Sequence, residues 1–362
     1  MKHLLVGGAV RDKLLGIPVA EQDWVVLGET PESMLQQGYR QVGKSFPVFL
    51  HPYTGDEYAL ARTEQNTGPG HQNFAFNSKP DVTLGEDLYR RDLTINAMAE
   101  TADGTIIDPY GGQSDLSNRL LRHVSPAFDE DPLRVFRLAR FYAKLEKFGF
   151  QVDDQTRLLC SNMVNRGDID SLSPERIFME LDKVLKTEHP EKFFTFIKDI
   201  GAAAHLWPDL TQAAIARMSL IAHSLEPAQK FACLCLGLTE TSLQKINDKV
   251  RLPKQWQDLN LLLARHYQQL VNPDLKSPAH IVTTLEHLDA RRKPDRFEKI
   301  LKIIEALQPI QSSIETAAKW RQWQALCAQA QTKDLPRHLT GAEIKTAVRA
   351  SHIDIIASHL RG

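Results

Sequence analysis

The spacing of hydrophobic residues changes along this chain, and the change divides it into two kinds of structure. Up to about residue 125, short apolar or β-branched runs bounded by Gly, Pro or Asp predict strands, at residues 3–6, 23–26, 39–42, 57–61 and 105–107. From Asp131 onward apolar residues recur with helical spacing, which predicts helices at residues 133–147, 153–165, 174–187 and 190–200 and further helices to the C-terminus. The pattern therefore predicts an α+β fold, in which a mixed β-sheet head precedes an all-helical part.

One polar segment interrupts the strand pattern. Between Thr63 and Asp87 the residues show no clear periodicity, and Gly, Pro, His, Gln and Asn gather at its centre. Long loops in compact domains are usually functional or mobile, so we expect a functional loop here.

Length and composition narrow the class of protein. A chain of 362 residues is too long for one ordinary core, so we expect two or more domains. No run of about eighteen apolar residues is present, so no membrane span is predicted. The apolar start is cut short by Gly7 and Arg11, which argues against a signal peptide. Four cysteines without a C-x-x-C spacing indicate reduced thiols and a cytoplasmic protein.

Charge is distributed unevenly along the chain. The net charge of −1 excludes a protein coated in positive charge, yet residues 251–362 carry 17 Lys and Arg against 11 Asp and Glu. The densest basic cluster lies at residues 291–302. This surplus fits an anionic partner for the C-terminal part, and it fits a solvated helical face equally well.

The first candidate for chemistry is a glycine turn followed by two acids. The predicted strand at residues 3–6 runs into Gly7 and Gly8, and a glycine turn lets backbone N–H groups approach a phosphate. Glu21 and Asp23 lie two residues apart at the start of the next strand, so their side chains share one face. Two carboxylates on one face are suited to a divalent cation such as Mg²⁺. A phosphate cradle beside a metal pair indicates phosphoryl or nucleotidyl transfer.

A second candidate is a helix that carries repeated arginines. Arg134, Arg137 and Arg140 recur every three residues and form one stripe on the predicted helix. Like charges this close are unfavourable without an anion nearby. Residues 90–97, which begin with two arginines and an aspartate, add further cations that could hold a triphosphate or a ribose.

Asp131 and Arg134, one helical turn apart, are candidates to read a nucleobase. Cytosine and adenine each present an amine donor beside a ring-nitrogen acceptor, which matches a carboxylate that accepts and a guanidinium that donates. Guanine and uracil present the reverse order and would leave buried groups unpaired, at a cost of about 1–3 kcal/mol for each lost hydrogen bond. One Asp–Arg pair can therefore select C and A together.

These runs resemble those of a known family. GGAVRD, the E-x-D pair, RRDLTINA, DPYGG and EDPLRVFRLARF, in this order and spacing, look like motifs A to D of the bacterial class II CCA-adding enzymes. The helix from Ser173 past Arg176 to Glu180 resembles that family's next motif. The family adds C, C and A to the 3′ end of tRNA from CTP and ATP without a nucleic-acid template. Its fold is a head, neck, body and tail, of which the last three are helical.

The resemblance implies a division of labour along the chain. It implies a nucleotidyltransferase head at residues 1–125, a helical neck at residues 126–200 that holds the nucleotide, and a helical body and tail at residues 201–362 that bind tRNA, with no DNA or membrane partner. The site residues that it implies are Gly8, Arg11, Arg91, Arg137 and Arg140 for the nucleotide, Glu21 and Asp23 for catalysis and Mg²⁺, and Asp131 and Arg134 for the base.

Two departures from the family pattern leave alternatives open. Glu21 stands where the family normally has Asp, and its extra methylene could weaken a metal that demands near-ideal geometry. The stretch at residues 233–238 lacks the His-Asp pair of the metal phosphohydrolase that some relatives carry, so we expect no phosphatase activity. The alternatives are a bacterial poly(A) polymerase, an enzyme that adds only CC or only A, and a tRNA-binding remnant inactivated at Glu21.

Overall fold

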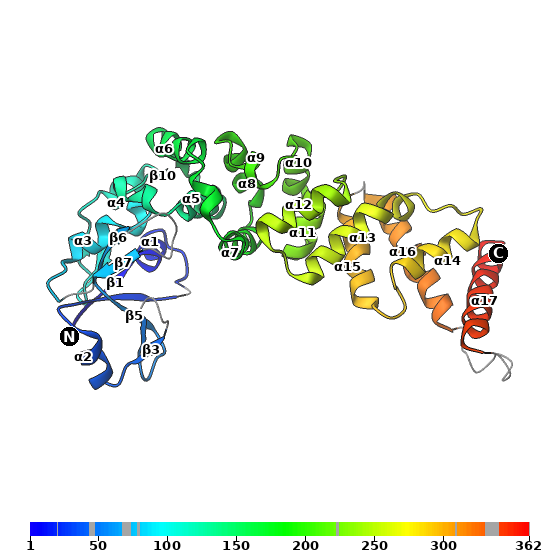
Figure 1. Ribbon diagram of the computed structural model, residues 1–362, viewed down its shortest axis with the longest axis horizontal. Helices are drawn as coiled ribbons and strands as arrows, with labels where there is room; N and C mark the ends of the chain where they lie inside the picture. Colours follow the sequence, from blue (N-terminus) through cyan, green and yellow to red (C-terminus); the bar gives the residue numbers. More distant parts are fainter. Residues whose placement is uncertain are drawn as a thin grey trace. The chain divides into compact units, whose positions relative to one another are not determined.

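The computed structural model describes two compact units. The first comprises Met1–Val184 with Lys192–His205, and the second comprises Leu185–Glu191 with Leu206–Gly362 (Figure 1). The residues that the structure describes are 1–19, 21–42, 48–66, 74–77, 80–221, 224–307, 310–329 and 340–361. The finer division into a head, a neck and a body with tail stays a prediction.

A mixed sheet of seven strands forms the centre of the first unit. Its order is β3-β4-β5-β2-β1-β8-β9, in which β2 and β5 are parallel and every other neighbouring pair is antiparallel. The bounds are β1 (Lys2–Val6), β2 (Asp23–Leu27), β3 (Arg40–Val42), β4 (Val48–Leu50), β5 (Glu57–Leu60), β8 (Ala99–Glu100) and β9 (Ile106–Ile107). All five predicted strands are present in it, with ends that differ by one residue at most.

The other strands were not predicted, because each is short. β4 and β8 span three and two residues, too few for an alternation of polar and apolar positions to be visible. The expectation of one loop from Thr63 to Asp87 is wrong in part. β6 (Thr63–Asn66) pairs with β7 (Phe74–Asn77), and α3 (Leu84–Tyr89) begins after the capping residue Thr83; residues 67–73 lie outside the described residues. The two-residue strands β10 (Leu120–Leu121) and β11 (Gln151–Val152) also pair.

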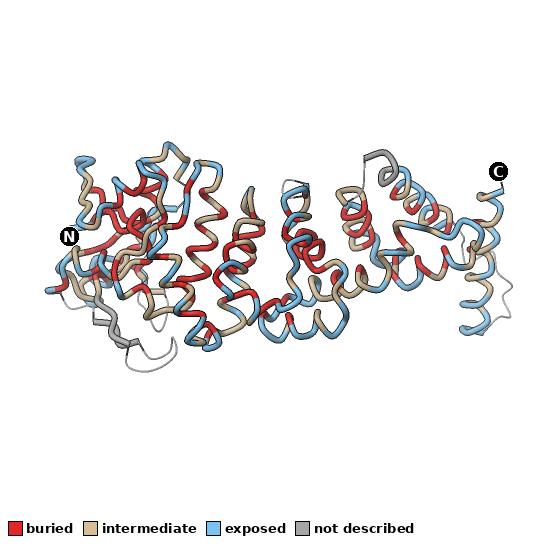
Figure 2. Tube along the Cα trace, turned by 90° about the horizontal axis from the view of Figure 1, so that it is seen from above, coloured by how far each residue is buried: buried red, intermediate tan, exposed pale blue. Residues whose placement is uncertain are grey.

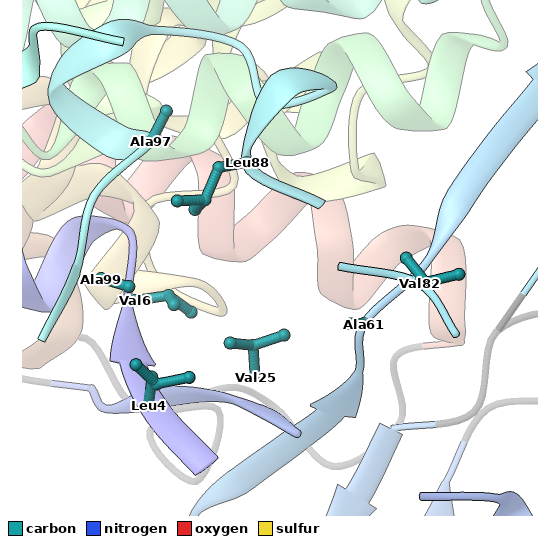
Figure 3. Packing of buried hydrophobic residues seen from close by; sticks show 8 residues of the cluster. All are labelled: Leu4, Val6, Val25, Ala61, Val82, Leu88, Ala97 and Ala99. Atoms are coloured by element: carbon teal, nitrogen blue, oxygen red, sulfur yellow. The ribbon is translucent and has the colours of Figure 1, made fainter. Parts of the chain in front are cut away.

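The two faces of the sheet bury different residues, because successive side chains of a strand point to opposite sides. Leu4, Val6 and Val25 pack on one face with Leu88 of α3 and with Ala97 and Ala99, as Figure 3 shows. On the other face Val26, Tyr58 and Leu60 pack with Met34. Asp23 is two residues before Val25 and is therefore on the first face, the side on which residues 88–99 pack.

The helices predicted for the first unit are confirmed. The four predicted at residues 133–147, 153–165, 174–187 and 190–200 correspond to α5 (Leu133–Leu145), α6 (Asp154–Asn165), α7 (Pro174–Leu185) and α8 (Pro190–Asp199). The shorter elements are α1 (Gly8–Leu14), α2 (Pro31–Gln36), α4 (Gly112–Ser117) and the 3₁₀ turns η1 (Thr94–Asn96), η2 (Pro126–Glu130), η3 (Glu146–Phe148) and η4 (Asp168–Ser171). The backbone N–H of Leu133 donates to Asp131 Oδ1 at 3.0 Å, so that Asp131 caps the first turn of α5.

The second unit is helical throughout its described part. After α9 (Ala203–Leu206) the helices are α10 (Gln212–Ile221), α11 (Pro227–Leu234), α12 (Glu240–Val250), α13 (Lys254–Val271), α14 (Pro278–His287), α15 (Pro294–Leu307), α16 (Ile310–Gln329) and α17 (Gly341–Arg361). Trp320 is buried, and its Nε1 donates to the Leu270 carbonyl at 2.8 Å, which ties α16 to α13. Figure 2 shows buried positions along these helices as well as in the first unit. Among the described helices none is both long and apolar enough to cross a bilayer.

Candidate nucleotide site

A cleft of about 820 Å³ in the first unit brings together every residue that the sequence nominated for chemistry. Its lining includes Gly8, Arg11, Glu21, Asp23, Arg91, Asp131, Arg134, Arg137 and Arg140. Ten basic side chains and six acidic ones line this cleft, so a positive surplus faces its interior. Such a surplus suits a polyanion such as a nucleoside triphosphate.

The glycine turn forms one end of the cleft. Gly7 has φ +73°, a conformation that costs glycine little, and α1 begins at the next residue. A Cβ on Gly7 would lie 2.9 Å from Arg91 Nη1, so a side chain here would collide with that guanidinium. The N–H groups of Gly8, Ala9 and Val10 precede the first intrahelical bond, from Arg11 N to the Gly7 carbonyl at 3.2 Å, and have no helical acceptor. The turn therefore offers backbone donors in an anion-binding arrangement.

Glu21 and Asp23 lie beside this turn at the start of β2. The register of the sheet places Asp23 next to Val6 of β1 and next to Glu57 of β5. Burial in the cleft raises the pKa of Asp23; Arg91 opposes this shift and the charge of Glu21 adds to it. Within the part of the chain that the structure describes, no hydrogen bond or ion pair engages the carboxylates of Glu21, Asp23 or Glu57.

The arginines, in contrast, are each held by another group. Arg11 is buried, its Nε donates to Asp12 Oδ1 at 2.8 Å, and its Nη1 donates to Asn96 Oδ1 at 2.6 Å. Arg91 Nη2 donates to Asp87 Oδ2 at 3.2 Å. Hydrogen bonds of this kind fix the orientation of a guanidinium before any ligand arrives. Arg11 and Arg91 are therefore pre-oriented, whereas the Glu21 and Asp23 carboxylates are unpaired.

Asp92 is the acid that orients Arg137. Arg137 Nε and Nη2 both donate to Asp92 Oδ2, at 2.8 and 2.6 Å, and Asn96 Nδ2 donates to Asp92 Oδ1 at 3.1 Å. Burial alone would raise the pKa of Asp92, but the charges of Arg137 and Arg134 and the hydrogen bonds from Asn96 and Arg137 hold it well below its ordinary value. Asp92 is therefore a buried anion at neutral pH, bound to the arginine stripe through Arg137.

The predicted base-reading pair lies at the N-terminal end of α5, where α7 and neighbouring backbone hold it. Arg176 Nη2 donates to Asp131 Oδ2 at 2.8 Å. Arg134 is buried and donates through Nη1 to the Ala127 carbonyl and through Nη2 to the Arg90 carbonyl, the latter at 2.7 Å. A guanidinium has five N–H donors and a carboxylate about four lone-pair sites. Both groups therefore keep unused hydrogen-bonding capacity while their positions are fixed.

Arg140 is held in a similar way, by a second residue of α7. Its Nε donates to Glu180 Oε2 at 2.6 Å, and its guanidinium lies 4.3 Å from the centre of the Phe141 ring. Glu180 is buried. The helix that begins at Ser173 thus supplies a partner both to the base-reading pair and to the arginine stripe.

Sequence reasoning assigned no role to Asp12, Asp92, Lys144, Arg176 or Glu180. Asp12 and Asp92 stand directly after Arg11 and Arg91, and this repeated Arg-Asp pair was the available signal for them. Lys144 follows Arg140 by four residues and so continues the arginine stripe. Arg176 and Glu180 lie in the run that resembles a family motif, but their partners are 45 and 40 residues away.

The donor set for a cation consists of carboxylate oxygens. No cluster of three or more His, Cys, Asp or Glu suited to a metal occurs among the described residues. Glu21 and Asp23 fit a hard divalent cation as a pair, because both are unpaired, both line the cleft, and oxygen donors suit Mg²⁺, which keeps several of its waters or substrate oxygens as further ligands.

Comparison with known proteins places the chain in a family. Residues 3–122 match the model of the poly A polymerase head domain, and residues 149–214 match a probable RNA- and SrmB-binding site of polymerase A. A CCA-adding enzyme of Coxiella burnetii (strain RSA 331 / Henzerling II) is 46% identical over 316 residues, covering 86% of this chain and 84% of that protein. One of Pseudomonas putida (strain F1) is 43% identical over 364 residues, covering 99% of each.

A solved structure shares the fold. The Thermotoga maritima CCA-adding enzyme, solved in complex with a tRNA, matches with a TM-score of 0.71 at 18% identity and covers 99% of this chain and 91% of that one. Taken together with the cleft and its arrangement of arginines and acids, these matches show that the chain belongs to the family of CCA-adding enzymes that are built on a poly A polymerase head.

Proposed function

We propose that this chain adds C, C and A to the 3′ end of tRNA, from CTP and ATP and without a nucleic-acid template. The observation that carries the proposal is the placement of two predicted pairs in one cleft: Asp131 with Arg134, and Glu21 with Asp23. The first pair has the donors and acceptors to read a base, and the second has the oxygens to hold a metal. Family membership at 43–46% identity supports the same activity.

The reaction is an in-line attack of the tRNA 3′ hydroxyl on the α-phosphate of the nucleotide, with pyrophosphate as the leaving group. Glu21 and Asp23 would hold Mg²⁺, which would supply activation of the hydroxyl and neutralisation of the charge that develops on the phosphates. The N–H groups of the turn at Gly8 donate to the phosphate oxygens. Arg11, Arg91, Arg137 and Arg140 hold the remainder of the nucleotide in reach of the two acids.

Base selection follows from the geometry at the start of α5. The free lone pairs of Asp131 accept from the exocyclic amine of cytosine or adenine, and the free N–H groups of Arg134 donate to the adjacent ring nitrogen. A uracil or a guanine places a carbonyl oxygen against the Asp131 carboxylate. That repulsion, together with the lost hydrogen bonds, rejects both bases.

The glutamate at position 21 sets this chain apart from the aspartate that the family normally carries. We infer that Glu21 is a working ligand, since it lines the cleft beside Asp23 and its carboxylate is unpaired. The alternative of an inactive remnant would require the extra methylene to prevent Mg²⁺ binding. A polyadenylating or partially adding enzyme would use the same cleft, so only the product distinguishes these activities.

The test is an extension assay read at single-nucleotide resolution. Purified protein is incubated with tRNA that lacks CCA, with CTP alone, with ATP alone, or with both, in Mg²⁺. We expect CC from CTP alone and complete CCA from both nucleotides. A long adenosine tail with ATP alone would indicate a poly(A) polymerase. Arrest after CC in the presence of both nucleotides would indicate an enzyme that adds only CC. Binding of tRNA without any incorporation would indicate the remnant.

A further inference from the structure

The arginine stripe of α5 continues beyond Arg140 to Lys144. Lys144 follows Arg140 by four residues, lies on the same side of the helix as Arg137 and Arg140, and lines the same cleft. A helix rises about 1.5 Å per residue, so Lys144 lies about 15 Å along the axis from Arg134. That distance is comparable with the length of an extended nucleoside triphosphate.

The two ends of the stripe contact different parts of the cleft. At the Arg134 end is Asp131, the other member of the base-reading pair, with Arg176 bound to it. At the other end Lys144 Nζ donates to Asp12 Oδ2 at 3.2 Å, and the other oxygen of Asp12 is bound by Arg11. Asp12 and Arg11 belong to α1, the helix that begins at the glycine turn. The stripe therefore runs from the base end to the phosphate end.

Charge at the phosphate end is unbalanced. The single carboxylate of Asp12 serves two cations, because Arg11 and Lys144 bind its two oxygens. Burial lowers the pKa of Lys144, and the charges of Arg11 and Arg140 lower it further, while Asp12 opposes the shift. Two cations that share one acid beside a glycine turn leave one positive charge uncompensated. An anion that entered this end of the cleft would compensate it.

We propose that Lys144 binds the β- and γ-phosphates of the incoming nucleotide, and the pyrophosphate that leaves. The inference rests on the proposed function, because that function assigns the base to Asp131 and Arg134 and the phosphates to the glycine turn. Lys144 has a flexible stem, and 39% of its side chain is exposed, so its ammonium can turn from Asp12 to a phosphate oxygen. Asp12 holds the ammonium in place when no nucleotide is bound.

Binding of CTP, CDP and CMP, measured by calorimetry, tests the proposal. Lys144→Ala should lower the affinity for CTP about tenfold and leave the affinity for CMP unchanged. A tenfold loss is about the lower end of what a charge-assisted hydrogen bond contributes. Lys144→Arg should retain most of the CTP affinity. Lys147→Ala is the matched control, since Lys147 lies in η3, directly after this helix, and is not part of the cleft lining. Inhibition by pyrophosphate should weaken in parallel with CTP binding.

A purely structural role for Lys144 would give a different result. If Lys144 acted only by fixing Asp12, then Lys144→Ala in an Asp12→Asn background would cause no further loss of CTP affinity. We expect the tenfold loss of CTP affinity to persist in that background. Equal weakening of CTP and CMP, or disappearance of the loss in the Asp12→Asn background, would overturn the proposal. Failure of the wild-type protein to extend tRNA would instead overturn the proposed function, whatever the variants bind.

Discussion

Arg176 Nη2 lies 2.8 Å from Asp131 Oδ2, an ion pair between residues 45 positions apart that ties α7 to the first turn of α5. The other oxygen of Asp131 accepts the backbone N–H of Leu133. Both carboxylate oxygens are thus fixed by protein groups, and their remaining lone pairs are available to a ligand, which we propose is the base. An acid held in this way can accept from hydrogen-bond donors without first reorganising.

Loss of Arg176 should therefore impair selection more than folding. We expect Arg176→Ala to lower kcat/KM for CTP about tenfold, because Asp131 loses one charge-assisted hydrogen bond and its fixed orientation. The preference for CTP over UTP should fall as well. The control is Arg166→Ala, which removes an exposed arginine paired with Asp129 and Asp168 outside the cleft. Unaltered selectivity in Arg176→Ala would show that α7 does not orient the acid.

Glu21 and Asp23 should respond differently to substitution. Asp23→Ala removes a ligand that lies between β1 and β5, so we expect loss of nucleotide incorporation with little change in melting temperature. Glu21→Asp restores the shorter side chain and should leave activity equal or higher. Chelation by EDTA should abolish incorporation by the wild-type protein, and added Mg²⁺ should restore it. Full CTP incorporation by Asp23→Ala would show that the metal assignment is wrong.

The glycine turn offers a test with an internal control. Gly7→Ala combines a positive φ with a Cβ only 2.9 Å from Arg91 Nη1, so we expect both a loss of stability of about 1–2 kcal/mol and a weaker affinity for CTP. Gly16 also has a positive φ, of +68°, but a Cβ there meets nothing within 4 Å. Gly16→Ala should cost similar stability and leave nucleotide binding intact. Equal CTP affinities in the two variants would contradict displacement of Arg91.

Asp92 should make stability depend on pH in acid. A carboxyl whose pKa is lowered on folding stabilises the protein above its unfolded pKa of about 3.9, and the contribution declines as pH falls below that value. Asp92→Asn leaves Arg137 without its carboxylate, which should cost about 3–5 kcal/mol at pH 7. In urea unfolding, the difference from wild type should be constant between pH 8 and pH 5 and shrink below about pH 4.

The matched variant for Asp92 is Asp129→Asn. Asp129 pairs with Arg166 at an exposed position, and exposed pairs contribute about 0–1 kcal/mol. A difference between Asp92→Asn and wild type that stayed the same down to pH 3 would mean that Asp92 is not an ionised partner of Arg137.

Much of the fold could be predicted from local patterns. β1 and β2 are short apolar runs that are buried on both faces, and α5 to α8 have full amphipathic turns, so these patterns are visible in the sequence. β4, β8, β10 and β11 span only two or three residues and were not predicted, whereas β3 and β9, which are as short, were predicted from runs bounded by Gly or Asp. β6 and β7 lie in a segment without periodicity. Each of these strands depends on its pairing with the other.

The residues of the candidate site also fall into those with a local signal in the sequence and those without one. The glycine turn, the Glu21 and Asp23 pair and the stripe on α5 are local arrangements, and all line one cleft as predicted. The acids that hold the arginines were not foreseen, because their partners are distant in sequence: Arg137 with Asp92, Arg140 with Glu180, and Lys144 with Asp12. Burial and fixed orientation arise from tertiary packing, which a single sequence does not display.

The most direct test of the account is whether the Asp131 carboxylate selects the base. The measurement is kcat/KM for CTP and for UTP on tRNA lacking CCA, for wild type, Asp131→Ala and the control Asp129→Ala. We predict that Asp131→Ala lowers the CTP to UTP ratio by about 10- to 100-fold, as expected for one charge-assisted hydrogen bond, while Asp129→Ala leaves the ratio unchanged. An equal loss for both nucleotides, with the ratio preserved, would contradict base reading by this side chain.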